Sequence, residues 1–343
     1  MPDDIRSQPD SLARVIDYQF GAGRKALVDA AAALRGAPRV IVSGMGASLY
    51  AAIPLAYRLG ASGLPVTVVE TSELLHYQSA LCRGAAVVLV SRSGNTVEVA
   101  KLLPALRDLG ATTIGVTNES DSALAREADH VLLVSSGRDE MVAVQTYTGA
   151  VMAMLLLGAE TLSEPMDDWR AAAGQTVAAV SAAIAHFVPA SSEWRAFLAG
   201  GQTMYVIGRG PSLASVHEGA LLFNETAKLP SVAAPAGTFR HGPVEVAGEA
   251  FHGIVFATQE PTRNLDLALA VDVSEMGAEV VTIAPEGSWP LPHTPHAFLP
   301  VVEIVPVQLA ALRAAEWRGI RPGDFRYVSQ VTTSETGFKP RVS

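Results

Sequence analysis

Cysteine is almost absent from this 343-residue chain, and long apolar runs are absent too. The single cysteine, Cys82, excludes an intramolecular disulfide, and chains without disulfides are typical of the cytoplasm. The longest apolar run covers residues 150–158, far fewer than the ~20 residues that cross a bilayer. The polar N-terminus contains no apolar signal core. We therefore expect a cytoplasmic protein without a membrane partner.

Charge is scarce as well. Only 17% of the residues are charged, and the net charge is −9. An acidic chain disfavours nonspecific binding of nucleic acid, so we expect no nucleic-acid partner. A small anionic ligand must therefore be bound by locally arranged donors, because the electrostatic field of the whole chain does not attract it. Hydrophobic residues make up 49% of the chain, enough for a large core, and its length predicts two domains.

The chain contains an internal repeat. An apolar strand pattern runs into Gly44-Met45-Gly46-Ala47-Ser48, and the same pattern runs into Gly208-Arg209-Gly210-Pro211-Ser212. Further on, residues 110–116 match residues 277–283 at nearly the same offset. Two independent matches at one offset predict a duplication.

Strand and helix patterns alternate within each copy. In the first copy we expect strands at 66–70, 85–91, 112–117 and 130–134, and helices at 95–109, 122–127 and 141–157. In the second we expect strands near 204–207, 253–257 and 279–283, and a helix at 212–228. This alternation predicts an α/β protein of two tandem units, each a parallel sheet between helices in a flavodoxin-like, three-layer α/β/α arrangement. The predicted parts are a helical segment 1–35, a first unit 36–165, a helical connector 166–195 and a second unit 196–343.

The motif Ser91-Arg92-Ser93-Gly94-Asn95-Thr96, here called the 91–96 loop, follows a strong strand pattern and opens a helix. Ligands of open parallel sheets bind at the carboxyl ends of strands, and a helix N-terminus offers N–H groups and a positive dipole end. The loop therefore predicts a phosphate site, although an ordinary serine N-cap would use the same residues. The matching segment of the second copy, residues 257–261, lacks the serines. We therefore expect one phosphate site per chain.

Two further positions could carry proton transfer. Glu218 and Glu225 are seven residues apart on one predicted helix, and an apolar environment would raise a carboxyl pKa toward the range of a general base. A solvated helix face would also explain them. His241 precedes Gly242-Pro243 in a loop, where it could shuttle protons or make a structural hydrogen bond.

Other patterns are weaker. The Gly44-x-Gly46 motif lacks the third glycine of a dinucleotide site. His293 and His296 lie in a proline-interrupted stretch without an acidic or cysteine partner nearby, so we expect no metal and no cofactor.

Taken together, these motifs resemble the sugar isomerase (SIS) family in its duplicated form, as in the isomerase half of glucosamine-6-phosphate synthase and its stand-alone relatives. The resemblance covers nearly the whole chain. Six segments carry it: 4–9, Gly46-Ala47-Ser48, the 91–96 loop, 140–146, 218–243 and 305–309.

The resemblance implies roles for individual residues. Glu225 falls on the family's enolisation base, and His241 on a ring-opening histidine that a neighbouring subunit supplies, which implies a homodimer. The implied substrate-binding residues are Gly46, Ala47, Ser48, Ser91, Arg92, Ser93, Thr96, Gln145 and Ser329.

The departures from the family pattern concern lysines. Ser329 stands in place of the synthase's imine-forming lysine, and Leu222 in place of another lysine near the base. Lys228 or Lys339 would have to replace the first of these. Because the resemblance includes no glutaminase domain, we do not expect glutamine-dependent synthesis.

The sequence thus predicts aldose–ketose isomerisation of a hexose or hexosamine 6-phosphate. One alternative is a deaminase or deglycase that acts on an aminosugar phosphate with the same base. Another is a noncatalytic phosphosugar sensor, although no helix-turn-helix pattern is visible in residues 1–35.

Overall fold

The computed structural model describes residues 1–200, 203–329 and 331–337, and the chain divides into two compact units. The first unit, which holds the first copy of the repeat, consists of Asp10–Arg138, Gln145–Ala171 and Phe325–Ser343. The second unit consists of Met1–Pro9, Asp139–Val144 and Ala172–Asp324. Each unit is therefore assembled from segments that are distant in the sequence.

The first unit is built on a parallel five-stranded sheet in the order β2-β1-β3-β4-β5. Its central strands are apolar and buried on both faces, which is typical of a parallel sheet covered by helices. The strands are β1 (Val40–Gly44), β2 (Val66–Glu70), β3 (Ala86–Val90), β4 (Thr112–Thr117) and β5 (His130–Leu133). All the strands predicted for this copy are present within one residue of their expected ends.

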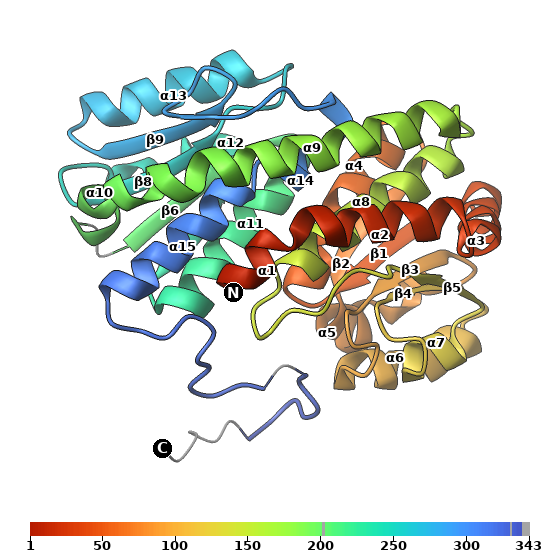
Figure 1. Cartoon of the computed structure of the whole chain (residues 1–343). Helices are drawn as coiled ribbons and strands as arrows, with labels where there is room; N and C mark the ends of the chain where they lie inside the picture. The colour runs from red at the N-terminus through yellow and green to blue at the C-terminus, as the bar shows by residue number, and fades with distance from the viewer. Residues whose placement is uncertain (201–202, 330, 338–343) are drawn as a thin grey trace. The chain divides into compact units, whose positions relative to one another are not determined.

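Helices cover both faces of this sheet (Figure 1). On one face, Ile41 and Leu89 pack with α6 side chains such as Leu102 in a buried cluster that also contains Cys82. On the other face, α4 and α8 pack against each other, and α4 contacts β1. The helices are α3 (Arg24–Gly36), α4 (Ala47–Ala61), α5 (Thr71–Glu73), η1 (Leu74–Gln78), η2 (Ser79–Cys82), α6 (Val97–Asp108), α7 (Ala123–Glu127) and α8 (Gln145–Thr161).

The second unit repeats this architecture. Its parallel sheet has the order β10-β9-β8-β6-β7, so β6 pairs with β7 and β8 as β1 pairs with β2 and β3. The strands are β6 (Thr203–Gly208), β7 (Ser231–Pro235), β8 (Phe251–Phe256), β9 (Glu279–Ala284) and β10 (Trp289–Pro290). The duplication and the α/β class predicted from the sequence are confirmed.

The helices of the second unit also lie on two faces of the sheet (Figure 1). Ile207 and Val255 pack with Leu269 of α13, whereas Val206, which points to the opposite face, lies beside Gly219 of α11. The helices are α1 (Pro2–Arg6), η3 (Ser191–Glu193), α10 (Arg195–Gly200), η4 (Gly210–Ser212), α11 (Leu213–Leu222), η5 (Phe223–Ala227), α12 (Ala236–Phe239), η6 (Pro243–Val246), α13 (Arg263–Glu275), η7 (His296–Phe298), α14 (Leu299–Val302) and α15 (Val305–Trp317). Helices α2 (Gln8–Phe20) and α9 (Met166–Ala190) contain residues of both units.

Two predicted helices differ from the structure. The helix expected at 141–157 begins only at Gln145. The preceding residues form bends, and the Asp139 carboxylate accepts the backbone N–H of Val144 there (3.1 Å). The helix expected at 212–228 is divided into α11 and the π-helical turn η5, which ends at Lys228 in a left-handed conformation (φ 51°).

Within the part of the chain that the structure describes, two helical stretches are long and apolar enough to cross a membrane if length and composition alone are considered. In Met166–Glu193, 33% of the most apolar window is buried, and in His296–Trp317 the share is 89%. The second stretch is apolar because it lies in the core of its unit. Core helices of soluble proteins meet the same criterion, so it gives weak support for a membrane span, and the expectation of no membrane partner stays a prediction.

Candidate functional site

The 91–96 loop lies at the carboxyl end of β3 and leads into α6. The Ser91 hydroxyl accepts the backbone N–H of Gly94 (3.1 Å) and shares a hydrogen bond with the Thr96 hydroxyl (3.0 Å). The backbone N–H of Asn95 donates to the Ser93 hydroxyl (3.3 Å). Hydroxyl groups and the N-terminus of a twelve-residue helix therefore meet in one tight turn.

Gly94 is required by the shape of this turn. Its φ of +61° lies in the left-handed region, and a Cβ added there would lie 2.2 Å from the Ser122 hydroxyl. The Gly94 carbonyl accepts the N–H of Leu124 (3.0 Å), and the Asn95 side chain accepts the N–H of Ala123 (2.9 Å). Hydrogen bonds from the start of α7 thus hold the 91–96 loop in place.

The loop after β1 lies against the 91–96 loop. The backbone N–H of Arg92 donates to the Ser48 hydroxyl (3.3 Å), and Gly46 (φ 50°) precedes α4. A Cβ on Gly44 would lie 2.9 Å from the Val90 carbonyl oxygen, so glycine allows the ends of β1 and β3 to approach closely. The structure therefore brings together seven of the predicted substrate-binding residues: Gly46, Ala47, Ser48, Ser91, Arg92, Ser93 and Thr96.

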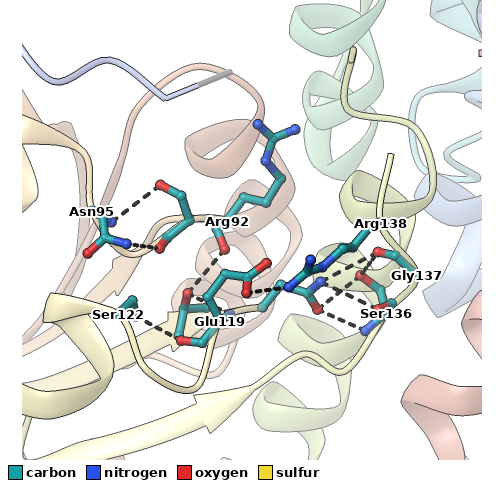
Figure 2. Close-up of polar contacts among 10 residues, drawn as sticks. Arg92, Asn95, Glu119, Ser122, Ser136, Gly137 and Arg138 are labelled. Carbon is teal, nitrogen blue, oxygen red and sulfur yellow. Dashed lines mark hydrogen bonds and ion pairs between the residues drawn. The ribbon is translucent and has the colours of Figure 1, made fainter. Parts of the chain in front are cut away.

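The loops after β4 and β5 complete this edge of the sheet (Figure 2). Thr117 donates its hydroxyl to the Arg92 carbonyl (3.1 Å), and the Asn118 side chain accepts the backbone N–H of Ser136 (2.9 Å). Glu119 pairs with the exposed Arg138 (2.9 Å). Sequence reasoning missed the side chains of Thr117, Asn118, Glu119 and Arg138. Thr117 ends a predicted strand and Asn118 and Glu119 follow it directly, which was the available signal, whereas Arg138 lies further along the chain.

Gln145 and Ser329 belong to the same unit but differ in setting. Gln145 begins α8, is buried, and donates its side-chain amide to the Arg138 carbonyl (2.7 Å), so it joins the edge formed by the strand ends. Ser329 is exposed and donates to the Val331 carbonyl (2.6 Å). Nearby, the Thr332 carbonyl accepts the backbone N–H of Val97, the first residue of α6 (3.1 Å). Lys339, the candidate substitute lysine, lies outside the described residues.

The second unit contains the two predicted carboxyl groups. Glu218 on α11 is 1% exposed, and its Oε2 has no hydrogen-bond partner among residues 1–200, 203–329 and 331–337. Burial, and then the negative charges of Glu225 and Asp139, raise the pKa of Glu218 well above its usual value. The half-buried Glu225 lies on η5. Glu218 therefore does not lie on a solvated helix face, and it is a carboxyl group whose pKa is raised strongly.

His241 follows α12, and its backbone N–H donates to the Thr238 carbonyl (2.9 Å). The residue is exposed, and Gly242 beside it has a φ of 130°. Cys82 is buried, and this burial raises the pKa of its thiol to about 11, which makes it an inert core residue. Across the described ranges, no three His, Cys, Asp or Glu side chains are grouped as metal ligands.

The chain is similar to known proteins in both sequence and fold. The SIS domain family matches residues 33–159 and 197–315, one segment in each copy of the repeat. The glutamine–fructose-6-phosphate aminotransferase (isomerizing) of Pyrobaculum aerophilum is 28% identical over 346 residues, which cover 97% of this chain. The chain spans only 57% of that relative's length.

Two solved structures illustrate the range of enzymes with this fold. The tagatose-6-phosphate ketose/aldose isomerase of Escherichia coli aligns with a TM-score of 0.77 at 20% identity over 94% of each chain. The glucosamine-6-phosphate deaminase of Thermotoga maritima aligns with a TM-score of 0.77 at 19% identity, over 96% of this chain and 98% of that one. At these identities the likeness concerns the fold alone. Because the family match covers more than half of the sequence and both repeats, the chain belongs to the SIS domain family.

Proposed function

We propose that this protein is a phosphosugar isomerase that interconverts the aldose and ketose forms of a hexose or hexosamine 6-phosphate. The observation that carries the proposal is the 91–96 loop, which gathers hydroxyl groups at the N-terminus of α6 and contacts α7 through Asn95 and Ser48 through the Arg92 N–H. The proposal includes a homodimer, a cytoplasmic location and the family roles of Glu225 and His241.

Phosphate binding is assigned to the first unit. The Ser93 and Thr96 hydroxyls and the N–H groups at the start of α6 are donors of the kind that bind phosphate oxygens. Because the loop is supported on several sides, little of its freedom is lost when a ligand binds. A phosphate held there contributes binding energy that orients the distant C1 and C2 atoms for reaction.

Proton transfer is assigned to Glu225. The carboxylate would remove the C2 proton of the open-chain aldose and return it to C1, while the proton of the O2 hydroxyl passes to O1, so that an enediol lies between the aldose and the ketose. Glu218 lies on the preceding turns of the same helical segment, and the negative charge of Glu225 contributes to the raised pKa of Glu218. His241 would assist ring opening.

A deaminase or deglycase is the second candidate. It is favoured by the Thermotoga maritima deaminase, which has this fold over 98% of its length, and by Ser329 and Leu222 at the two positions where the resemblance has lysines. A deaminase would use the same enediol chemistry but release ammonia. A sensor would bind the sugar phosphate without exchanging its protons.

The test is a panel of hexose and hexosamine 6-phosphates incubated in deuterated water, with deuterium at C1 and C2 followed by NMR and ammonia measured in parallel. We expect deuterium uptake without ammonia, and a loss of about 10²–10⁴-fold in Glu225→Gln. The matched control is Glu275→Gln, an exposed glutamate at the end of α13, which should keep full activity.

Each other outcome decides against the isomerase. Ammonia release would favour the deaminase. If every sugar phosphate that binds does so without deuterium uptake, the noncatalytic sensor is the remaining candidate.

A further inference from the structure

A fully buried carboxylate, Glu303, lies between α14 and α15 in the second unit. Three hydroxyl groups bind it. Ser215 donates to Oε1 (2.8 Å), Ser212 donates to Oε2 (3.1 Å), and Thr258 makes a short hydrogen bond to Oε2. Gln259 in turn donates its side-chain amide to the Ser212 hydroxyl (2.9 Å). Both oxygens of the carboxyl group are therefore held by neutral donors.

The place of this cluster in the fold is informative. Ser212 follows β6 as Ser48 follows β1, and Thr258 follows β8 as the 91–96 loop follows β3. In the first unit the two loops meet through the Arg92 N–H and the Ser48 hydroxyl (3.3 Å). In the second unit the Ser212 and Thr258 hydroxyl oxygens lie 2.9 Å apart. The Glu303 carboxylate thus lies against the same pair of strand ends as the proposed phosphate site.

The chemistry of the cluster suits an oxyanion. A buried charge is stable only when hydrogen bonds replace the lost water, and hydroxyl donors to a carboxylate are strong ones. Burial raises the pKa of Glu303 above its usual value, and the hydrogen bonds from Thr258, Ser215 and Ser212 offset part of this rise. The donors therefore reduce the free-energy cost of a negative charge at this buried position.

We propose that the second unit retains an oxyanion site formed by Ser212, Ser215 and Thr258, and that Glu303 is its built-in ligand. The site would accept a small carboxylate or phosphate if the side chain were removed. In the natural chain, Glu303 closes it and joins the α14–α15 segment to the ends of β6 and β8. This goes beyond the proposed function, because it concerns a site that the substrate does not occupy.

Chemical rescue tests the proposal. Glu303→Ala removes the carboxylate and leaves room for a small anion. We expect this variant to unfold at a lower temperature than the natural protein, and sodium formate or acetate to raise its Tm saturably, by about 5 °C. Sodium chloride at equal ionic strength should not do so. The natural protein and Glu303→Gln should show no anion-specific rise.

Two double variants test where the rescuing anion binds. Glu303→Ala with Ser215→Ala should lose it, because a donor is missing. Glu303→Ala with Ser91→Ala should keep it, because the 91–96 loop is not involved. The second variant also separates this proposal from the proposed function, since a protein that fails to bind any sugar phosphate could still be rescued. Absence of an anion-specific rise in the Glu303→Ala variant overturns the proposal.

A second comparison covers the case in which Glu303→Ala does not fold. The variant is then refolded with and without formate, and recovery only in formate supports the site. If neither condition gives folded protein, Glu303→Gln is compared with Glu303→Leu. The proposal expects a higher Tm for glutamine, whose carbonyl still accepts a hydroxyl, than for leucine. Equal Tm values contradict it.

Discussion

Glu218 illustrates how a single residue responds to its surroundings. Its carboxyl is buried, lacks a partner for Oε2 among the described residues, and experiences the negative charges of Glu225 and Asp139. All three conditions disfavour ionisation, so its pKa is raised well above the usual 4.5. An acid with a raised folded-state pKa stabilises the protein fully below its unfolded pKa. This stabilisation is lost as the pH rises through the folded pKa.

This loss of stability with rising pH can be tested by a pH series on the Glu218→Gln variant. The variant should resemble the natural protein below pH 4.5, where both carry a neutral side chain at this position. Above that pH the natural protein should lose free energy of unfolding relative to the variant, by about 1.4 kcal/mol for each pH unit up to the folded pKa. Denaturant unfolding between pH 4 and 9 measures the difference, with Glu275→Gln as the exposed control. Parallel curves for the natural protein and Glu218→Gln would show that the carboxyl is ionised normally.

Gly94 permits a second residue-scale prediction with a matched control. Gly94 and Gly110 have nearly the same φ (+61° and +63°), but a Cβ on Gly94 meets the Ser122 hydroxyl, whereas a Cβ on Gly110 meets nothing within 4 Å. Alanine at either position should cost about 1–2 kcal/mol of stability from left-handed strain. Only Gly94→Ala should additionally distort the 91–96 loop and weaken binding of a sugar 6-phosphate, measured by calorimetry. Equal affinities for the two variants would mean that phosphate is bound elsewhere.

Secondary structure elements show what the sequence could predict. The strands β1 and β3 were predictable because buried parallel strands are nearly continuous apolar runs bounded by turn residues. The strands β7 and β10 were missed because β7 is alanine-rich, β10 has two residues, and both end in proline. The π-helical turn η5 was missed because one extra residue per turn leaves no mark in the hydrophobic period.

The candidate site was predictable to the same extent as its elements. Because the carboxyl ends of neighbouring parallel strands share an edge, residues after β1 and β3 could be placed together from the sequence. Thr117, Asn118 and Glu119 lie at that edge too. Their position at the end of a predicted strand pointed to it, but their residue types match no known motif. Glu303 was missed for a different reason. It is an isolated acidic residue in an apolar stretch, and its hydroxyl partners are distant in the sequence.

At the scale of the whole molecule, the proposal predicts that two chains share each site. Glu225 and His241 carry different roles, and the resemblance assigns His241 to a neighbouring subunit. In a mixed dimer of Glu225→Gln and His241→Ala chains, one site would then lack both groups and the other would contain both. Random mixing should restore about a quarter of the natural activity, since half of the dimers are mixed and each has one intact site.

The experiment uses the two inactive variants, mixed under conditions in which subunits exchange. Light scattering coupled to gel filtration establishes that each variant and the mixture are dimers, and isomerase turnover is then measured. If both groups of a site belonged to one chain, no combination of these variants could contain an intact site. Mixed dimers without activity would therefore assign His241 to the same chain as its Glu225. A monomeric protein would remove the shared site altogether.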